Sequence, residues 1–132
     1  MKLLFAIVLL LCSSMTYAAF KCNPDGNQAE LNQCALDDYQ AADKQLNDTW
    51  KKLMLKFKND KTASSKLKIA QKAWLAFRDA EVDAMFACAN PVSNCWGSME
   101  PMLRYGELST LTQERTKRLQ KYLSQGLGVP ME

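Results

Sequence analysis

Apolar residues recur every three or four positions between Leu31 and Phe57, and this series indicates the fold class. The series consists of Leu31, Ala35, Tyr39, Ala42, Leu46, Trp50, Leu53 and Phe57. This spacing is typical of one face of an α-helix, because a helix turns once in about 3.6 residues. Asn27 followed by Glu30 has the pattern of a capping box, so we expect a long helix from there to about Lys58.

Two further segments have helical spacing. The first is expected to start after Thr62 and to run to about Cys88, with an inner stripe of Leu67, Ala70, Trp74, Phe77, Ala84 and Met85. The second is expected to be capped by Ser98, with Pro101 in its first turn and an inner side of Leu103, Leu108, Leu111, Arg115, Leu119 and Tyr122. No segment alternates as a strand does. The sequence therefore predicts an all-α antiparallel bundle of three main helices.

The N-terminus has the pattern of a secretory signal peptide. Lys2 precedes an uncharged apolar run, Leu3 to Leu11, which is too short to span a bilayer, and small residues lead to Ala18. We expect residues 1–18 to be removed and residues 19–132 to form one periplasmic or secreted domain. A lipoprotein acylated at Cys12 is the alternative, and the bulky Leu11 before that cysteine argues against it.

Four cysteines remain after this processing, and an even number in an exported chain indicates two disulfides. Three pairings are possible. We prefer Cys22 with Cys34 and Cys88 with Cys95, because each bond closes a short loop at the edge of a helix. The chain has no histidine and no C-x-x-C pair, so we expect neither a metal site nor a cofactor.

Composition leaves little room for catalysis or nucleic-acid binding. The absence of histidine removes the most frequent general base, and the carboxylates at Asp37, Asp38, Asp79, Glu81 and Asp83 have the spacing of solvated helix positions rather than of a glycosidase pair. Loss of the leader removes Lys2 alone among 17 basic and 14 acidic residues, which leaves a net charge of +2. We therefore expect a protein partner, no nucleic acid and no enzymatic activity.

The segment from Gln71 to Asp79 places Gln71, Trp74 and Arg78 on neighbouring faces of the second helix. In the structural interpretation Trp74 packs into the core, while Gln71 and Arg78 bind polar groups of the first helix such as Asp43 and Asn47. In the alternative interpretation the same residues form a binding surface. We prefer the structural one, because buried polar groups of a bundle need partners.

Five short motifs in order resemble the LprI-like lysozyme-inhibitor family. They are Asn32-Gln33-Cys34-Ala35, Ala42-Asp43 with Leu46-Asn47, Gln71-x-x-Trp74-x-x-x-Arg78-Asp79, Gly97-Ser98, and Leu111-Thr112-x-x-Arg115-Thr116-x-x-Leu119. The resemblance implies an exported, all-helical, disulfide-bearing domain whose named member inhibits lysozyme. Relatives often carry cysteines where this chain has Val82 and Glu107, so Cys88 and Cys95 resemble a relocated disulfide.

An inhibitor needs a rigid scaffold and a projecting side chain rather than catalytic groups. The candidate is the loop that includes Ser93, Asn94, Trp96 and Ser98, which would occlude the cleft of a lysozyme-type muramidase. In the alternative interpretation of this loop, Trp96 folds back over the end of the bundle. A second hypothesis for the function is an envelope scaffold without a lysozyme partner. A net charge of +2 gives no attraction to basic lysozymes, unless Glu100, Glu107 and Glu114 form a local acidic patch. The oligomeric state is left open.

Overall fold

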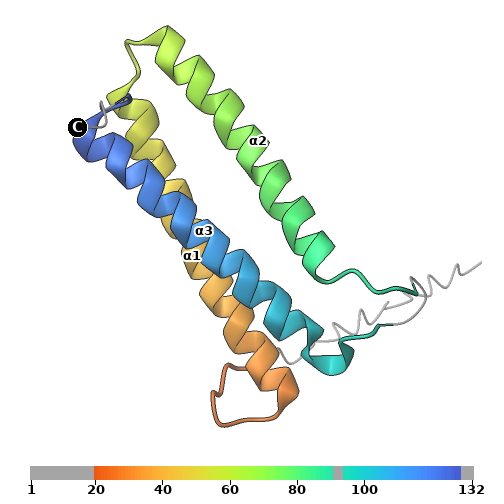
Figure 1. Ribbon diagram of the computed structural model, residues 1–132. Helices are drawn as coiled ribbons and strands as arrows, with labels where there is room; N and C mark the ends of the chain where they lie inside the picture. The colour runs from red at the N-terminus through yellow and green to blue at the C-terminus, as the bar shows by residue number, and fades with distance from the viewer. Residues whose placement is uncertain (1–19, 91–93, 129–132) are drawn as a thin grey trace, which may run out of the picture.

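The computed structural model describes residues 20–90 and 94–128, and within them the fold is all-helical, as predicted (Figure 1). Its helices are α1 (Gln28–Lys56), α2 (Lys61–Met85), the short 3₁₀ helix η1 (Gly97–Met99) and α3 (Glu100–Gln125). The chain runs up α1, down α2 and up α3. The side chain of Asn32 reaches Ser98 and that of Lys56 reaches Tyr122, both 66 positions further along, so α1 and α3 run parallel in one constant register.

Two of the three expected helix starts need correction. The capping box at Asn27 and Glu30 is present, with each side chain bonded to the backbone of the other. The cap of α2 is Asp60 rather than Thr62, and its carboxylate accepts the backbone N–H of Ala63 at 2.8 Å. Ser98 is not a cap, because it lies inside η1. A charged carboxylate is the better acceptor for the exposed amides at a helix start, which explains the choice of Asp60.

The α1–α3 contact is built largely from small side chains. Its buried members are Ala42, Leu46, Thr49 and Leu53 on α1, and Ser109, Thr112, Thr116 and Leu119 on α3. The predicted inner side of α3 is right for Leu119, whereas Leu103, Leu108, Leu111, Arg115 and Tyr122 are half-buried. Small residues let two helices approach closely, and the hydroxyl of Thr116 is satisfied by the carbonyl of Thr112 at 2.9 Å.

Helix α2 is rotated relative to the prediction. Its buried residues are Leu67, Gln71, Arg78 and Val82, with Trp74 half-buried beside them. Four members of the predicted stripe are instead exposed, namely Ala70, Phe77, Ala84 and Met85. Figure 1 shows α2 set apart from the closely paired α1 and α3. Long side chains span that separation, as Arg78 does when it reaches Thr112 of α3. Long polar and aromatic residues therefore form the inner face of α2.

Each end of the bundle is held by its own contacts. Both predicted disulfides, Cys22–Cys34 and Cys88–Cys95, are present, and both lie at the end where α1 begins and α2 ends. The cluster of Leu46, Leu53, Leu67 and Leu119 fills the other half of the core. None of the helices in the described ranges is long and apolar enough to cross a bilayer.

Candidate functional site

Trp96 directly follows Cys95 of the Cys88–Cys95 disulfide and lies at one end of the bundle. The indole is 41% exposed, and one edge meets the buried ring of Phe86, with ring centroids 5.2 Å apart. Trp96 therefore packs on the bundle through part of its ring and offers the rest to solvent. Both sequence interpretations, projection and coverage of the bundle end, hold in part.

The backbone around Trp96 is fixed by its neighbours. The side chain of Asn94 accepts the N–H of Trp96 and donates to the carbonyl of Gly97, both at 3.1 Å. Gly97 has a φ of 62°, a left-handed conformation that favours glycine. Ser98 contributes its carbonyl, which accepts the side-chain N–H of Asn32 at 3.1 Å and ties η1 to α1. The fourth residue predicted for this loop, Ser93, lies outside the described residues.

Arg104 joins the ends of α2 and α3 beneath this loop. Its guanidinium binds Asp83 at 2.7 Å and Glu100 at 2.6 Å, and it lies 5.2 Å from the centre of the Phe86 ring. The hydrogen bonds to Glu100 and Asp83 raise the pKa of Arg104, so this cation stays charged at every accessible pH. Arg104 thereby fixes the position of Phe86, whose ring packs against Trp96.

A polar and aromatic layer crosses the middle of the bundle around Arg78. Its guanidinium pairs with Asp79 at 2.8 Å, lies 3.9 Å from Asp43 and donates to the hydroxyl of Thr112 at 3.3 Å. Asp43 also accepts from the amide of Asn47 at 2.9 Å. One buried cation thus connects all three helices, and the expected contact of Arg78 with Asp43 is present.

Trp74 lies in the same layer, next to two guanidinium groups. Arg78 and Arg115 are 5.3 and 5.7 Å from the centre of its ring. Gln71 accepts a hydrogen bond from Arg115 of α3 at 2.9 Å, so its partner is on the third helix and not on the first as expected. Burial lowers the pKa of Arg115. The structure thus brings together seven residues of the middle and last family motifs, here called the seven family-motif residues. They are Asp43, Asn47, Gln71, Trp74, Arg78, Asp79 and Arg115.

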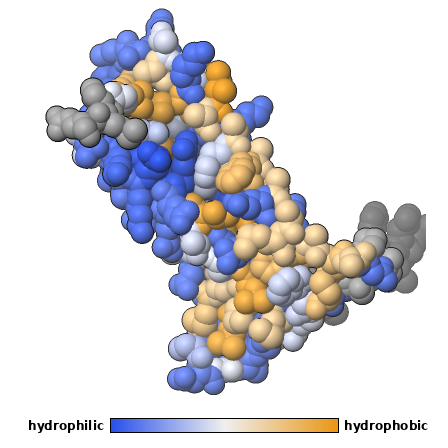
Figure 2. All heavy atoms as spheres, in the orientation of Figure 1, coloured by the Kyte–Doolittle hydropathy of each residue, from blue (hydrophilic) through white to orange (hydrophobic). Residues whose placement is uncertain are grey.

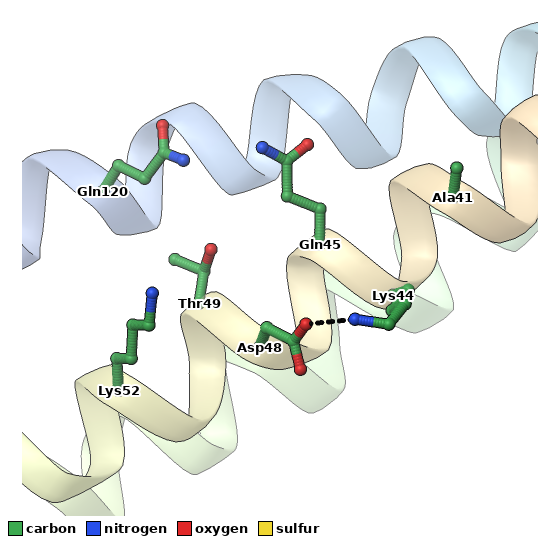
Figure 3. A pocket seen from close by; sticks show the side chains of 7 residues that line it. All are labelled: Ala41, Lys44, Gln45, Asp48, Thr49, Lys52 and Gln120. Carbon is green, nitrogen blue, oxygen red and sulfur yellow. Dashed lines mark hydrogen bonds and ion pairs between the residues drawn. The ribbon is translucent and has the colours of Figure 1, made fainter.

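A polar groove lies on another side of the molecule, between α1 and α3, and no pattern in the sequence had indicated it (Figure 3). It has a volume of about 340 Å³ and is lined by Ala41, Lys44, Gln45, Asp48, Thr49, Lys52 and Gln120. Its one carboxylate, Asp48, accepts a hydrogen bond from Lys44 at 2.8 Å, which lowers the pKa of Asp48. A single ionised carboxylate paired with an ammonium lacks the second acid that glycoside hydrolysis needs.

The charges of the described chain are segregated along the bundle. We define the disulfide end as residues 20–43, 78–90 and 94–107, and the basic end as residues 44–77 and 108–128. The disulfide end carries ten acidic and three basic residues, a net charge of −7, whereas the basic end carries 13 basic and three acidic residues, a net charge of +10. Glu100 and Glu107 belong to the disulfide end, but Glu114 does not. The near-neutral total therefore conceals an acidic surface around Trp96.

Comparison with known proteins is consistent with this architecture. The family described as "Lysozyme inhibitor LprI" matches residues 20–119. An uncharacterised protein of Rhizobium meliloti (strain 1021) is 36% identical over 134 aligned positions, which cover 89% of this chain and 92% of that relative. No solved structure matches. With a family match that covers both disulfides, α1, α2 and most of α3, the chain belongs to the LprI lysozyme-inhibitor family.

Proposed function

We propose that this protein is exported to the periplasm and there inhibits a lysozyme-type muramidase by occluding its substrate cleft. Residues 1–18 act as the signal peptide, and the oxidising compartment forms the two disulfides. Membership of an inhibitor family supports a binding protein rather than an enzyme. The disulfide end is the contact surface, with Trp96 at its centre.

The observation that carries this proposal is that Trp96 is half-exposed at the disulfide end, which has a net charge of −7. Lysozymes of animals are strongly basic, so an acidic surface would attract them over several ångströms and orient the approach. Tryptophan is among the residues enriched at positions that dominate binding energy. The hydrogen bonds of Asn94 to the backbone of Trp96 and Gly97 fix the chain at the tryptophan, so little conformational entropy is lost on binding.

The seven family-motif residues have a structural role in this proposal. Arg78 and Gln71 are 6% and 8% exposed, and their hydrogen bonds are made to other residues of the bundle. Such groups hold α2 in position and so fix the end from which Trp96 projects. Arg78 and Gln71 are too deeply buried to serve as the contact surface.

Charge location provides the test. In one variant Asp37→Asn and Asp38→Asn remove two exposed acids of the disulfide end. In a matched control Ser65→Lys and Gln125→Lys change the net charge by the same amount at exposed positions of the basic end. Lysis of a bacterial suspension by lysozyme is followed at low and high salt. We expect the first variant to inhibit less at low salt and the control to inhibit like the parent.

Three results would contradict the proposal. Equal losses in both variants would mean that net charge, and not the disulfide end, controls association. Absence of inhibition by the parent protein against several lysozymes would favour an envelope scaffold. Hydrolysis of peptidoglycan by the protein alone would show that it is an enzyme.

A further inference from the structure

The basic end carries more positive charge than its own acidic residues neutralise. Thirteen basic residues share it with three acids. Asp48 is hydrogen-bonded to Lys44, and Asp60 caps α2. In the described ranges, ion pairs at this end involve only Lys44 and Lys51, both with Asp48. Most of its lysines therefore present uncompensated charge to the surroundings.

Apolar side chains are exposed among these lysines. Leu55 is 68% exposed and Ile69 is 63% exposed. A shallow hollow of about 480 Å³ is lined by Trp50, Lys51, Met54 and Leu55. Figure 2 shows orange atoms next to blue ones at the upper end of the molecule, where α1 meets α2. Apolar groups set among cations are typical of surfaces that lie at a membrane interface.

We propose that the basic end docks onto the surface of a bilayer that contains anionic phospholipids. The lysines contact the phosphate-bearing headgroups, and Leu55 with the hollow beside Trp50 enters the boundary between headgroups and acyl chains. Tryptophan favours this depth because its ring is apolar and its N–H is polar. A soluble polyanion would satisfy the lysines equally well but would gain nothing from Leu55, which is why the bilayer is the better fit.

The geometry gives this docking a consequence. Helix α3 has 26 residues and is therefore roughly 40 Å long. With the basic end on the membrane, the disulfide end and its Trp96 point away from the membrane into the aqueous compartment. Docking is independent of the proposed inhibition, since it is measured on lipid alone with no lysozyme present.

Vesicle sedimentation tests the charge requirement. The purified, oxidised protein is mixed with vesicles of phosphatidylglycerol and phosphatidylethanolamine, and separately with phosphatidylcholine vesicles. We expect binding to the anionic vesicles alone, and weaker binding at high salt. The triple variant Lys51→Gln, Lys58→Gln, Lys61→Gln removes three exposed charges. At about fivefold per lysine, its affinity for anionic vesicles should fall on the order of 100-fold.

A matched control carries the same net charge with the change at the other end. Gln40→Glu, Ala84→Glu and Ala89→Glu are exposed positions of the disulfide end. This control should bind anionic vesicles within about fivefold of the parent. Each of its new charges lies more than one screening length away from Lys51, Lys58 and Lys61. Equal losses in the two triple variants would overturn the proposal, and so would equal binding to neutral and anionic vesicles.

Leu55→Gln distinguishes the bilayer from a soluble polyanion. Loss of this exposed leucine should weaken vesicle binding about tenfold and leave binding to soluble polyphosphate unchanged. Unchanged vesicle binding by Leu55→Gln would show a site for soluble polyanions and refute membrane docking. Helical content measured for each variant confirms that the fold is intact.

Discussion

Trp74→Ala tests how α2 is held against the rest of the bundle. The ring is half-buried between α2 and the α1–α3 pair, with the guanidinium groups of Arg78 and Arg115 at 5.3 and 5.7 Å. Removal of a packed tryptophan costs about 3 to 5 kcal/mol. Partial exposure of this ring places the expected loss near the lower limit, about 3 kcal/mol, which corresponds to a decrease in Tm of roughly 10 to 20 °C.

The control is Phe77→Ala, three positions further along the same helix. Phe77 is 55% exposed on the outer side of α2, so its removal should change the free energy of unfolding by no more than about 0.5 kcal/mol. Urea unfolding of both variants, followed by circular dichroism with the disulfides intact, gives the comparison. Superimposable curves for Trp74→Ala and the parent would refute the structural role of this layer. A larger loss in Phe77→Ala would mean that α2 faces the other way.

Three further outcomes follow from the structure and the sequence. Burial raises the pKa of Tyr39, so an absorbance titration should find a phenol that ionises above pH 10 and that is missing from the titration of Tyr39→Phe. The stabilisation that depends on this protonated phenol is complete below pH 10 and is lost as the pH rises through the pKa of the folded state. Thiol titration of denatured, unreduced protein should find no free thiol, and reduction should cost about 2 to 5 kcal/mol per bridge. Intact mass should show a mature N-terminus at Ala19 or Phe20 without lipid, whereas an acylated Cys12 would overturn this processing.

Sequence periodicity predicted the helices well but not all of their inner faces. For α1 it identified three of the four buried residues, Ala42, Leu46 and Leu53, and missed Thr49. The other members of that stripe are half-buried. On α2 two stripes compete. Leu67, Gln71, Trp74, Arg78 and Val82 also have helical spacing, and the structure buries all of this set except Trp74, which is half-buried. A hydropathy pattern ranks arginine and glutamine as exposed, although pairing within the core satisfies both.

The inner face of α3 differs from the prediction for another reason, although the helix itself and buried Leu119 were predicted. Its buried residues include Ser109, Thr112 and Thr116, which are small enough to let α1 approach closely. Periodicity of large apolar residues does not detect contacts that depend on small size. The pairing of Cys88 with Cys95, next to Trp96, was predicted in advance because the bond closes a short loop. The segregation of charge was readable from the sequence only after the up-down-up order of the helices was combined with the position of each charge.

The proposed inhibition depends on Trp96 as the contact with the muramidase. The most direct measurement compares the inhibition constants and unfolding free energies of the parent, Trp96→Ala and the control Leu55→Ala, which truncates an exposed apolar residue at the basic end. Trp96→Ala should weaken inhibition by about 2 kcal/mol or more, roughly thirtyfold, and change stability by no more than about 1 kcal/mol, while Leu55→Ala inhibits like the parent. Inhibition by Trp96→Ala at the parental level, or a parallel loss of inhibition and stability, would contradict the claim.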